Sequence, residues 1–415
     1  MTAAHATAAP AAPGWRTPLL IIACGCILSF IAFGVRSGTG LFLSPISTEL
    51  GWGREVFALS IAFQMLIWGA CVPIAGAIAD KFGAGRVLAV GSLFYGGGFA
   101  LMAYSSEPWH MHLTVGALVG IGLAGTSFTI VLAVLARIVR PERRTFVVGL
   151  CTAFTSLGQF IILPLGQGFI SAYGWHTAAI VLGAIALCML PFAFVVRNNG
   201  TASHDARDLP LKAALAEAFG HRSYVLLVTG FFVCGFQLFF ILNHLPSYLS
   251  DKGQPPWVAG WTLALVGLGN VVGGILAGYA GARWSKRIGL ASIYLARSAL
   301  TVAFILLPLT PATTLIYGGL MGLLWLSTVP LTQGLVAQFF GLRWIATLFG
   351  IAFFSHQIGG FLGVWLGGLL FDLYQSYDIV WWLNIALGVF AAVVHLPIRE
   401  VPAPRLAAAA IAGAR

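Results

Sequence analysis

Charged side chains are scarce in this sequence. Asp, Glu, Lys and Arg together make up 8% of the 415 residues, whereas 59% of the residues are hydrophobic. A water-soluble domain usually carries about 25% charged residues, so this chain could not cover a water-facing surface of its size. The composition excludes a soluble globular protein and predicts that lipid surrounds most of the chain. The 51 glycines and 30 phenylalanines suit lipid, because glycine lets membrane helices approach closely and phenylalanine faces acyl chains at little cost.

Sequence patterns for enzyme chemistry, metal binding and nucleic-acid binding are also missing. No paired carboxylates, nucleophile–base motif or phosphate-binding glycine loop occurs in a suitable context. The six cysteines lie in apolar runs without the histidine spacing of a metal site, and we interpret them as small buried hydrophobic side chains. The net charge of +10 comes from basic residues in short loops between apolar runs, which argues against a nucleic-acid partner. We expect no enzyme activity, no cofactor and no metal.

Long apolar runs, by contrast, fill the chain. A helix needs about 20 apolar residues to cross a bilayer. Runs near that length occur at residues 18–45, 57–79, 86–105, 111–138, 146–172, 176–196, 224–249, 258–282, 288–309, 313–340, 345–371 and 379–397. They predict an all-α membrane protein with twelve transmembrane helices in two six-helix pseudo-repeats.

Polar segments divide these runs into domains. We expect a disordered cytoplasmic N-terminus at 1–17, an N-terminal six-helix bundle at 18–196, a cytoplasmic linker at 197–222, a C-terminal six-helix bundle at 223–398 and a cytoplasmic tail at 399–415. The first apolar run is too long for the apolar part of a cleaved signal peptide, which spans about 7–15 residues. We therefore expect this run to remain in the protein as a membrane helix.

The distribution of Lys and Arg predicts the orientation in the membrane. Of the 22 such residues, only Arg54 and Lys252 fall in loops on one side, and Arg36 and Arg297 fall within spans. The rest lie on the other side. Because cytoplasmic loops carry an excess of Lys and Arg, we expect both termini in the cytoplasm and the chain in a bacterial inner (plasma) membrane.

The two halves resemble each other weakly in sequence. A shift of 201 residues pairs Gly149, Gly158, Phe160, Gly166 and Tyr173 with Gly350, Gly359, Phe361, Gly367 and Tyr374. The fifth and eleventh spans are therefore expected to be equivalent. Parallel halves related by an axis along the membrane normal bring a ligand site between them, near the bilayer midplane.

A loop with a distinctive spacing separates the second and third spans. It contains Gly76, Asp80, Lys81, Gly83 and Arg86. This pattern resembles the signature G-x-x-x-D-[RK]-x-G-x-x-[RK] of the major facilitator superfamily. Its glycines permit a tight turn and close helix contact, while the Asp can cap a helix end and pair with the basic residues as a gating latch. The resemblance implies the two-bundle fold of that superfamily and a secondary transporter.

Within the superfamily, the chain is most similar to the monocarboxylate transporter family and its bacterial relatives. Residues 36–42 (RSGTGLF) resemble that family's Lys-Ser-x-Thr-x-Phe-Phe segment, whose lysine serves substrate and proton coupling. Residues 270–277 (NVVGGILA) resemble its Arg-Pro-Ser-x-Gly-Leu-Val-Ala segment. Here the chain departs from the pattern, because Asn270 replaces the carboxylate-binding arginine and Val266 replaces the preceding aspartate. The resemblance implies that Arg36 is the retained cation.

Two arginines at membrane depth need an explanation, because a charge at the bilayer centre costs at least about 2.5–3.5 kcal/mol. Arg36 is a candidate anion clamp, since a guanidinium binds a carboxylate through two hydrogen bonds. The alternative is that it extends to the membrane surface, because its span ends about nine residues later. Arg297 lies about ten residues into the ninth span. Bonding to neighbouring helices and substrate contact are equal alternatives for it.

Other polar residues within spans complete the candidate site. His356 and His244 are candidates for proton coupling, because imidazole titrates near pH 6.5; the alternative is a structural histidine bonded within the protein. Among several amides we favour Asn270 and Asn243 as cavity-lining residues, although such side chains also join helices. The predicted substrate-binding set is Arg36, Asn270, Arg297, His356 and Asn243.

The positions of the twelve acidic residues indicate the charge of the substrate. All lie in loops or at the ends of predicted spans: Glu49, Glu55, Asp80, Glu107, Glu142, Asp205, Asp208, Glu217, Asp251, Asp372, Asp378 and Glu400. Drug–proton antiporters and sugar–proton symporters generally place a carboxylate inside the membrane. Buried arginines without buried acids predict a positive cavity, and hence a small organic anion as substrate.

We therefore predict a monomeric secondary active transporter that moves a small organic anion, a monocarboxylate, by alternating access, with a proton as a candidate co-substrate. The alternative is an efflux transporter for hydrophobic or drug-like compounds, which the segment from Gly158 to Gly168 with Pro164 loosely suggests. A non-transporting receptor is disfavoured, because the short loops leave no room for a signalling domain.

Overall fold

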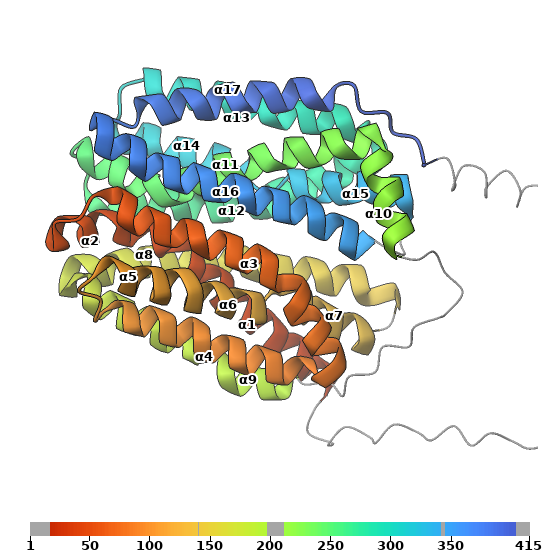
Figure 1. Cartoon of the computed structure of the whole chain (residues 1–415), viewed down its shortest axis with the longest axis horizontal. Coiled ribbons are helices and arrows are strands. Elements are labelled where there is room, and N and C mark those ends of the chain that lie inside the picture. Colours follow the sequence, from red (N-terminus) through yellow and green to blue (C-terminus); the bar gives the residue numbers. More distant parts are fainter. Residues whose placement is uncertain (1–16, 140, 197–210, 342–344, 404–415) are drawn as a thin grey trace, which may run out of the picture.

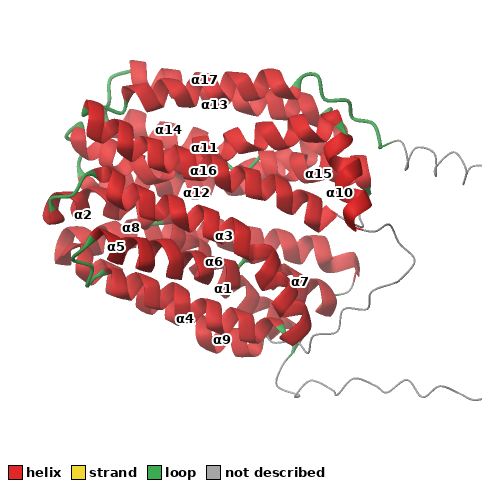
Figure 2. Cartoon of the chain, in the orientation of Figure 1, coloured by secondary structure: helices red, strands yellow, loops and turns green. Residues whose placement is uncertain are grey.

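The computed structural model describes residues 17–139, 141–196, 211–341 and 345–403. Within these ranges all regular structure is helical and no strand occurs (Figure 2), which confirms the predicted all-α fold class. Apart from Thr17, the predicted N-terminal segment 1–17 lies outside the described residues, and so does the tail beyond Ala403.

The first half of the chain builds one bundle, in the lower part of Figure 1. Its helices are α1 (Pro18–Ser37), η1 (Thr39–Phe42), α2 (Leu43–Leu50), α3 (Arg54–Phe82), α4 (Ala84–Met102), α5 (Pro108–Met111), η2 (His112–Leu118), α6 (Val119–Gly125), α7 (Phe128–Ile138), α8 (Pro141–Leu187) and α9 (Met189–Val195). Several of these elements follow one another with little or no break, so one membrane crossing often comprises two or more of them.

The second half builds the other bundle, in the upper part of Figure 1. Its helices are α10 (Leu211–Gly220), α11 (Arg222–Asp251), α12 (Pro256–Arg283), α13 (Lys286–Leu306), α14 (Pro311–Leu324), α15 (Thr328–Phe340), α16 (Ile345–Tyr374) and α17 (Asp378–His395). We did not predict helix α10, which lies in the expected linker 197–222. Its buried residues Ala214 and Ala218 are one turn apart, the spacing of an amphipathic helix.

The described helices account for twelve membrane crossings. Eleven apolar helical segments are long enough to cross a bilayer, and one of them, Val147–Val195, has 49 residues. At 1.5 Å per residue it would be about 73 Å long, more than twice the hydrocarbon core of a bilayer. Gly174 interrupts it with φ 80° and ψ 166°, a conformation that glycine adopts without a steric penalty. The segment therefore crosses twice, which gives six crossings in each half, as predicted.

Glycines at repeated positions let the same pair of helices cross in each half. A Cβ atom on Gly34 of α1 would lie 2.6 Å from the Gly158 carbonyl oxygen of α8. A Cβ atom on Gly235 of α11 would lie 3.0 Å from the Gly360 amide nitrogen of α16. The shift of 201 residues relates Gly34 to Gly235 and Gly158 to Gly359. The internal repeat in the sequence thus corresponds to a shared close contact between helices.

The two bundles meet along an interface that we call the seam. It consists mainly of α3 against α16 and of α8 against α12, and Figure 1 shows α3 and α16 side by side along it. Glycines bring α3 and α16 close at two points, where Gly368 faces Ala58 and Gly69 faces Gln357. Aromatic pairs such as Trp68–Phe353 lie between the same helices elsewhere. The seam is where side chains of both halves can reach one ligand.

Replacement of Gly158 by alanine tests the crossing of α1 and α8. Alanine favours a helix over glycine by about 1 kcal/mol, but a Cβ atom at Gly158 would strike the Phe30 backbone, and overpacking costs about 1–3 kcal/mol. We expect Gly158→Ala to lower the apparent melting temperature of the purified protein. Gly149→Ala, on the same helix with no atom within 4 Å of its Cβ position, should leave it unchanged or raise it. Equal effects of the two substitutions would contradict the packing.

Candidate functional site

Arg36 lies within the protein, close to the seam. It stands one residue before the end of α1 and is 8% exposed. Its guanidinium carbon lies 5.0 Å from the ring centre of Phe33, 4.7 Å from that of Trp68 and 5.0 Å from that of Phe239. These rings come from α1, α3 and α11, so both halves of the protein contribute. We call Arg36, Phe33, Trp68 and Phe239 the Arg36 cage.

The charge of Arg36 has no protein counter-ion among the side chains that the structure describes. The ion pairs found there join Arg54 to Asp251 and His176 to Glu49. Within the same ranges the Arg36 Nε atom is buried and has no hydrogen-bond partner. Contact with aromatic faces supplies about 0.5–2 kcal/mol, less than the cost of a charge at membrane depth. Rings of both halves surround the guanidinium, which argues against the alternative that it extends to the membrane surface.

His356 lies next to the Arg36 cage. Its ring packs edge-on against Phe239 of the cage, with 5.4 Å between ring centres, and stacks with Phe353 at 6.0 Å. Phe353 in turn meets Trp68 across the seam at 5.3 Å. The His356 Nδ1 atom lies 3.2 Å from the Gln357 side-chain oxygen. The structure thus brings Arg36 and His356, two predicted site residues, into one aromatic cluster.

Asn270 and Asn243 are bonded within the protein. Asn270 of α12 donates to the Ser156 hydroxyl of α8 at 3.2 Å and accepts from the Leu326 backbone N–H at 3.0 Å. Asn243 donates to the Phe239 carbonyl of its own helix at 2.8 Å. Asn270 therefore joins the two halves at the seam, which is the helix-joining role that we had disfavoured.

Arg297 binds backbone carbonyls at the break between helices α14 and α15. Its guanidinium donates to the Leu324 carbonyl from Nε at 3.1 Å and from Nη2 at 2.6 Å, and also to the Trp325 carbonyl. These carbonyls stand where α14 ends, and so lack partners within a helix. Nη1 contacts the Cys234 sulfur at 3.3 Å, and the residue is 1% exposed. Of its two alternatives, the structure shows the bond to neighbouring helices.

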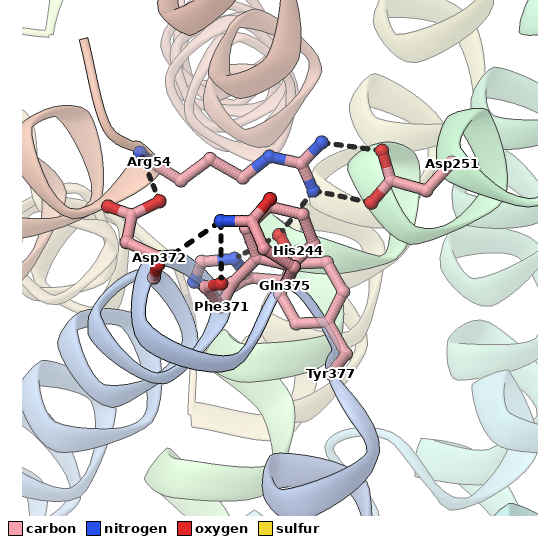
Figure 3. Close-up of polar contacts among 7 residues, drawn as sticks. All are labelled: Arg54, His244, Asp251, Phe371, Asp372, Gln375 and Tyr377. Atoms are coloured by element: carbon pink, nitrogen blue, oxygen red, sulfur yellow. Dashed lines mark hydrogen bonds and ion pairs between the residues drawn. The ribbon is translucent and has the colours of Figure 1, made fainter.

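A polar network that the sequence did not reveal joins the halves at one end of the seam (Figure 3). Arg54, the first residue of α3, donates to both carboxylate oxygens of Asp251 at 2.6 and 2.5 Å and to the Tyr377 hydroxyl at 2.9 Å. The backbone N–H groups of Arg54 and Glu55 donate to Asp372 at 2.9 and 2.7 Å. We call Arg54, Asp251, Asp372 and Tyr377 the Arg54 latch. The partners are up to 323 residues apart in the chain, so their pairing could not be predicted from the sequence of this protein alone.

His244 belongs to this end of the molecule. Its Nε2 atom lies 2.7 Å from the Val364 carbonyl oxygen and its Nδ1 atom 3.2 Å from the Tyr377 hydroxyl. Both ring nitrogens are therefore engaged, and the side chain is fully buried. His244 connects the Arg54 latch to α16 and is separate from the Arg36 cage.

The predicted gating loop forms a tight turn between α3 and α4. Gly83 has φ 93°, which explains why glycine occupies the turn. Lys81 and Arg86 are exposed, and a Cβ atom at Gly76 would meet no atom within 4 Å, so no close helix contact is seen there. The side chain of Asp80, the expected cap, lies outside the described ones.

Comparisons with known proteins identify the family. The sequence model of the Major Facilitator Superfamily matches residues 25–364. The chain is 24% identical to the MFS-type transporter YcxA of Bacillus subtilis, over 87% of this chain and 90% of that protein. It is 25% identical to monocarboxylate transporter 13 of Rattus norvegicus, over 88% and 84% of the two chains. It is also 25% identical to multidrug resistance protein MdtH of Klebsiella pneumoniae, over 82% and 84%.

Solved structures share the fold. A bacterial homologue of the human lysosomal transporter Spinster, in an inward-facing and unoccupied conformation, matches with a TM-score of 0.73 and 12% identity, over 93% of this chain and 97% of that one. A D-xylose–proton symporter matches with a TM-score of 0.67 and 15% identity, over 94% and 98%. Both neighbours are transporters rather than enzymes. Together with the family match over most of its length, these findings show that the chain is a multi-pass membrane transporter belonging to the major facilitator superfamily.

Proposed function

We propose that this transporter moves a small organic anion, a monocarboxylate, across a bacterial inner membrane. The observation that carries the proposal is the Arg36 guanidinium, which is enclosed by residues of both halves and has no acidic partner among the described side chains. A carboxylate would supply the missing negative charge through paired N–H···O bonds. The likeness to monocarboxylate transporter 13 supports the same substrate class.

Arginine suits this task better than lysine. Its planar guanidinium stays charged in an apolar site and stacks on aromatic rings while its N–H groups remain free for a carboxylate. Arg297, the other arginine at membrane depth, is occupied by backbone carbonyls. A single free positive charge fits an anion with one carboxylate.

Alternating access would proceed by rocking of the two bundles about the seam. The Arg54 latch closes one end of the seam, and the Arg36 cage lies farther along it, where α1, α3 and α11 approach one another. His356 is the better candidate for proton coupling, since it lies beside the cage, whereas His244 belongs to the latch. The excess of Lys and Arg in alternate loops supports cytoplasmic termini, and we propose a monomer as the working unit.

Efflux of hydrophobic compounds is the second candidate. The likeness to MdtH favours it, and so does the aromatic character of the Arg36 cage. A lipophilic cation, however, would have to lie beside an unneutralised guanidinium. Competition of transport by lipophilic cations would support efflux, whereas competition by small organic acids would support the anion transporter.

Replacement of Arg36 by glutamine tests the proposal. The change keeps hydrogen-bonding capacity but removes the charge, so uptake of the best organic acid into proteoliposomes should fall by about a hundredfold or more, the equivalent of 2.7 kcal/mol. Lys212→Gln is the matched control, because Lys212 is an exposed cation on α10, which packs against α11 rather than along the seam, and it should retain full uptake. Full uptake by Arg36→Gln would overturn the assignment.

Weakening the Arg54 latch should favour the state in which this end of the seam is open. Ala58 is fully buried against Gly368, so in a cysteine-free background Ala58→Cys should react slowly with a maleimide. Adding Arg54→Gln or Asp251→Asn should raise the rate several-fold. The two together should do no more than the stronger one alone, because both break the same bond.

The control for this experiment is Tyr104→Cys, at a position that is 74% exposed. Its labelling rate should be the same with and without the latch substitutions. Labelling of Ala58→Cys that is unaffected by Arg54→Gln would contradict a gating role for the latch.

A further inference from the structure

Three buried N–H donors without partners gather around the Arg36 cage. They are the Arg36 Nε, the Trp68 Nε1 and the Gln64 Nε2 atoms, none of which has a hydrogen-bond partner among the described residues. The Gln64 side-chain oxygen, an acceptor, is unpaired as well. Trp68 lies against the Arg36 guanidinium. Gln64 precedes Trp68 by four residues in α3, which places both on the same face of that helix, and Gln64 is fully buried.

Such a concentration of unsatisfied donors is unusual inside a protein. Buried polar groups are nearly always hydrogen-bonded, and each exception calls for an explanation. Other buried polar atoms of the described residues also lack partners, the Trp381 Nε1 atom among them. The cage differs because its unpaired N–H donors include a guanidinium and lie on neighbouring residues, whereas the guanidinium of Arg297 is bonded to the Leu324 and Trp325 carbonyls. A ligand that accepts several hydrogen bonds would explain the exceptions at the cage. A carboxylate has two oxygens, no hydrogen to donate and about four acceptor positions.

The surroundings of these donors are aromatic. Phe33 and Phe239 face Arg36 directly. Phe353 lies between Trp68 and His356, and Phe231 packs on His356 with 4.9 Å between ring centres. A ligand held by its carboxylate at Arg36 would therefore place the rest of its body among ring faces and edges. Rings at these distances favour another ring or a branched apolar group.

We infer that the site is built for carboxylates with an aromatic or branched apolar body, and that Gln64 and Trp68 are substrate-binding residues which hold the carboxylate together with Arg36. The inference rests on the proposed anion transport and narrows its substrate class. It disfavours dicarboxylates, because the described part of the seam offers no second free guanidinium: Arg297 is bonded to carbonyls and Arg54 to Asp251. It also disfavours small acids such as lactate, whose body is too small to cover the ring faces around the cage.

Equilibrium binding to the purified full-length protein tests the substrate class. The ligands are phenylacetate, lactate, succinate and the neutral amide phenylacetamide. We expect phenylacetate to bind with a Kd at least about tenfold lower than that of lactate or succinate, and phenylacetamide to bind far more weakly than phenylacetate. Equal affinities for lactate and phenylacetate would overturn the inference while leaving anion transport intact. Binding of phenylacetamide but of none of the three acids would overturn anion transport itself.

Substitutions separate the roles of the donors from those of the rings. Trp68→Phe keeps a ring but removes the N–H group, and Gln64→Met keeps the shape but removes the amide. Each should therefore raise the Kd of every acid by roughly tenfold. Phe239→Leu removes a ring and should raise the Kd of phenylacetate by a larger factor than the Kd of lactate. The control Phe390→Leu lies on α17 at a position that is 47% exposed, and it should change nothing.

Each variant is compared only if it elutes as a single species in gel filtration, and Gln64→Leu replaces Gln64→Met if that variant does not. Unchanged phenylacetate binding in both Trp68→Phe and the Gln64 variant would overturn the assignment of the donors. An unchanged ratio of phenylacetate to lactate affinity in Phe239→Leu would overturn the role of the ring.

Discussion

A guanidinium inside a membrane protein must be neutralised or solvated by something, and the two deeply placed arginines of this chain meet that requirement differently. Arg297 bonds the carbonyls that are left free where α14 stops. Arg36 has aromatic faces around it, an Nε atom without a partner and no acid beside it among the described side chains. Rings compensate a charge only in part. Arg36 therefore remains attractive to an anion, and the proposed substrate, its route and the role of the surrounding donors all follow from that unfilled requirement.

The contacts within each half differ in kind from the contacts between the halves. Within each half, glycines at equivalent positions hold α1 against α8 and α11 against α16 at backbone distance, which favours bundles that move as units. Between the halves, the contacts are of kinds that can separate. The Arg54 latch depends on one ion pair and on hydrogen bonds at a helix end, and Asn270 makes one amide–hydroxyl bond to Ser156. The Arg36 cage draws its rings from both bundles, so a ligand there is sensitive to how the bundles approach each other.

Hydropathy predicted the crossings to within a few residues, because each apolar run must match the bilayer thickness. The position of Arg36 within the first helix followed from the same apolar run. The role of Arg297 could not be predicted from the sequence. The Leu324 carbonyl that it bonds is free only because α14 ends there, and the sequence of α14 and α15 is one apolar run without a sign of that break. The Arg54–Asp251 pair is 197 residues apart, and pairing at that range depends on tertiary structure. Helix α10 was missed although its apolar residues recur at helical spacing.

The most direct test of the central claim is an experimental structure of the protein with a bromine-labelled aryl carboxylate, such as 4-bromophenylacetate, whose position the bromine marks. The account predicts carboxylate oxygens at hydrogen-bond distance from the Arg36 guanidinium, about 2.7–2.9 Å, and the brominated ring among the residues around Phe239. A ligand bound away from Arg36, or an Arg36 side chain paired with a protein carboxylate, would contradict it.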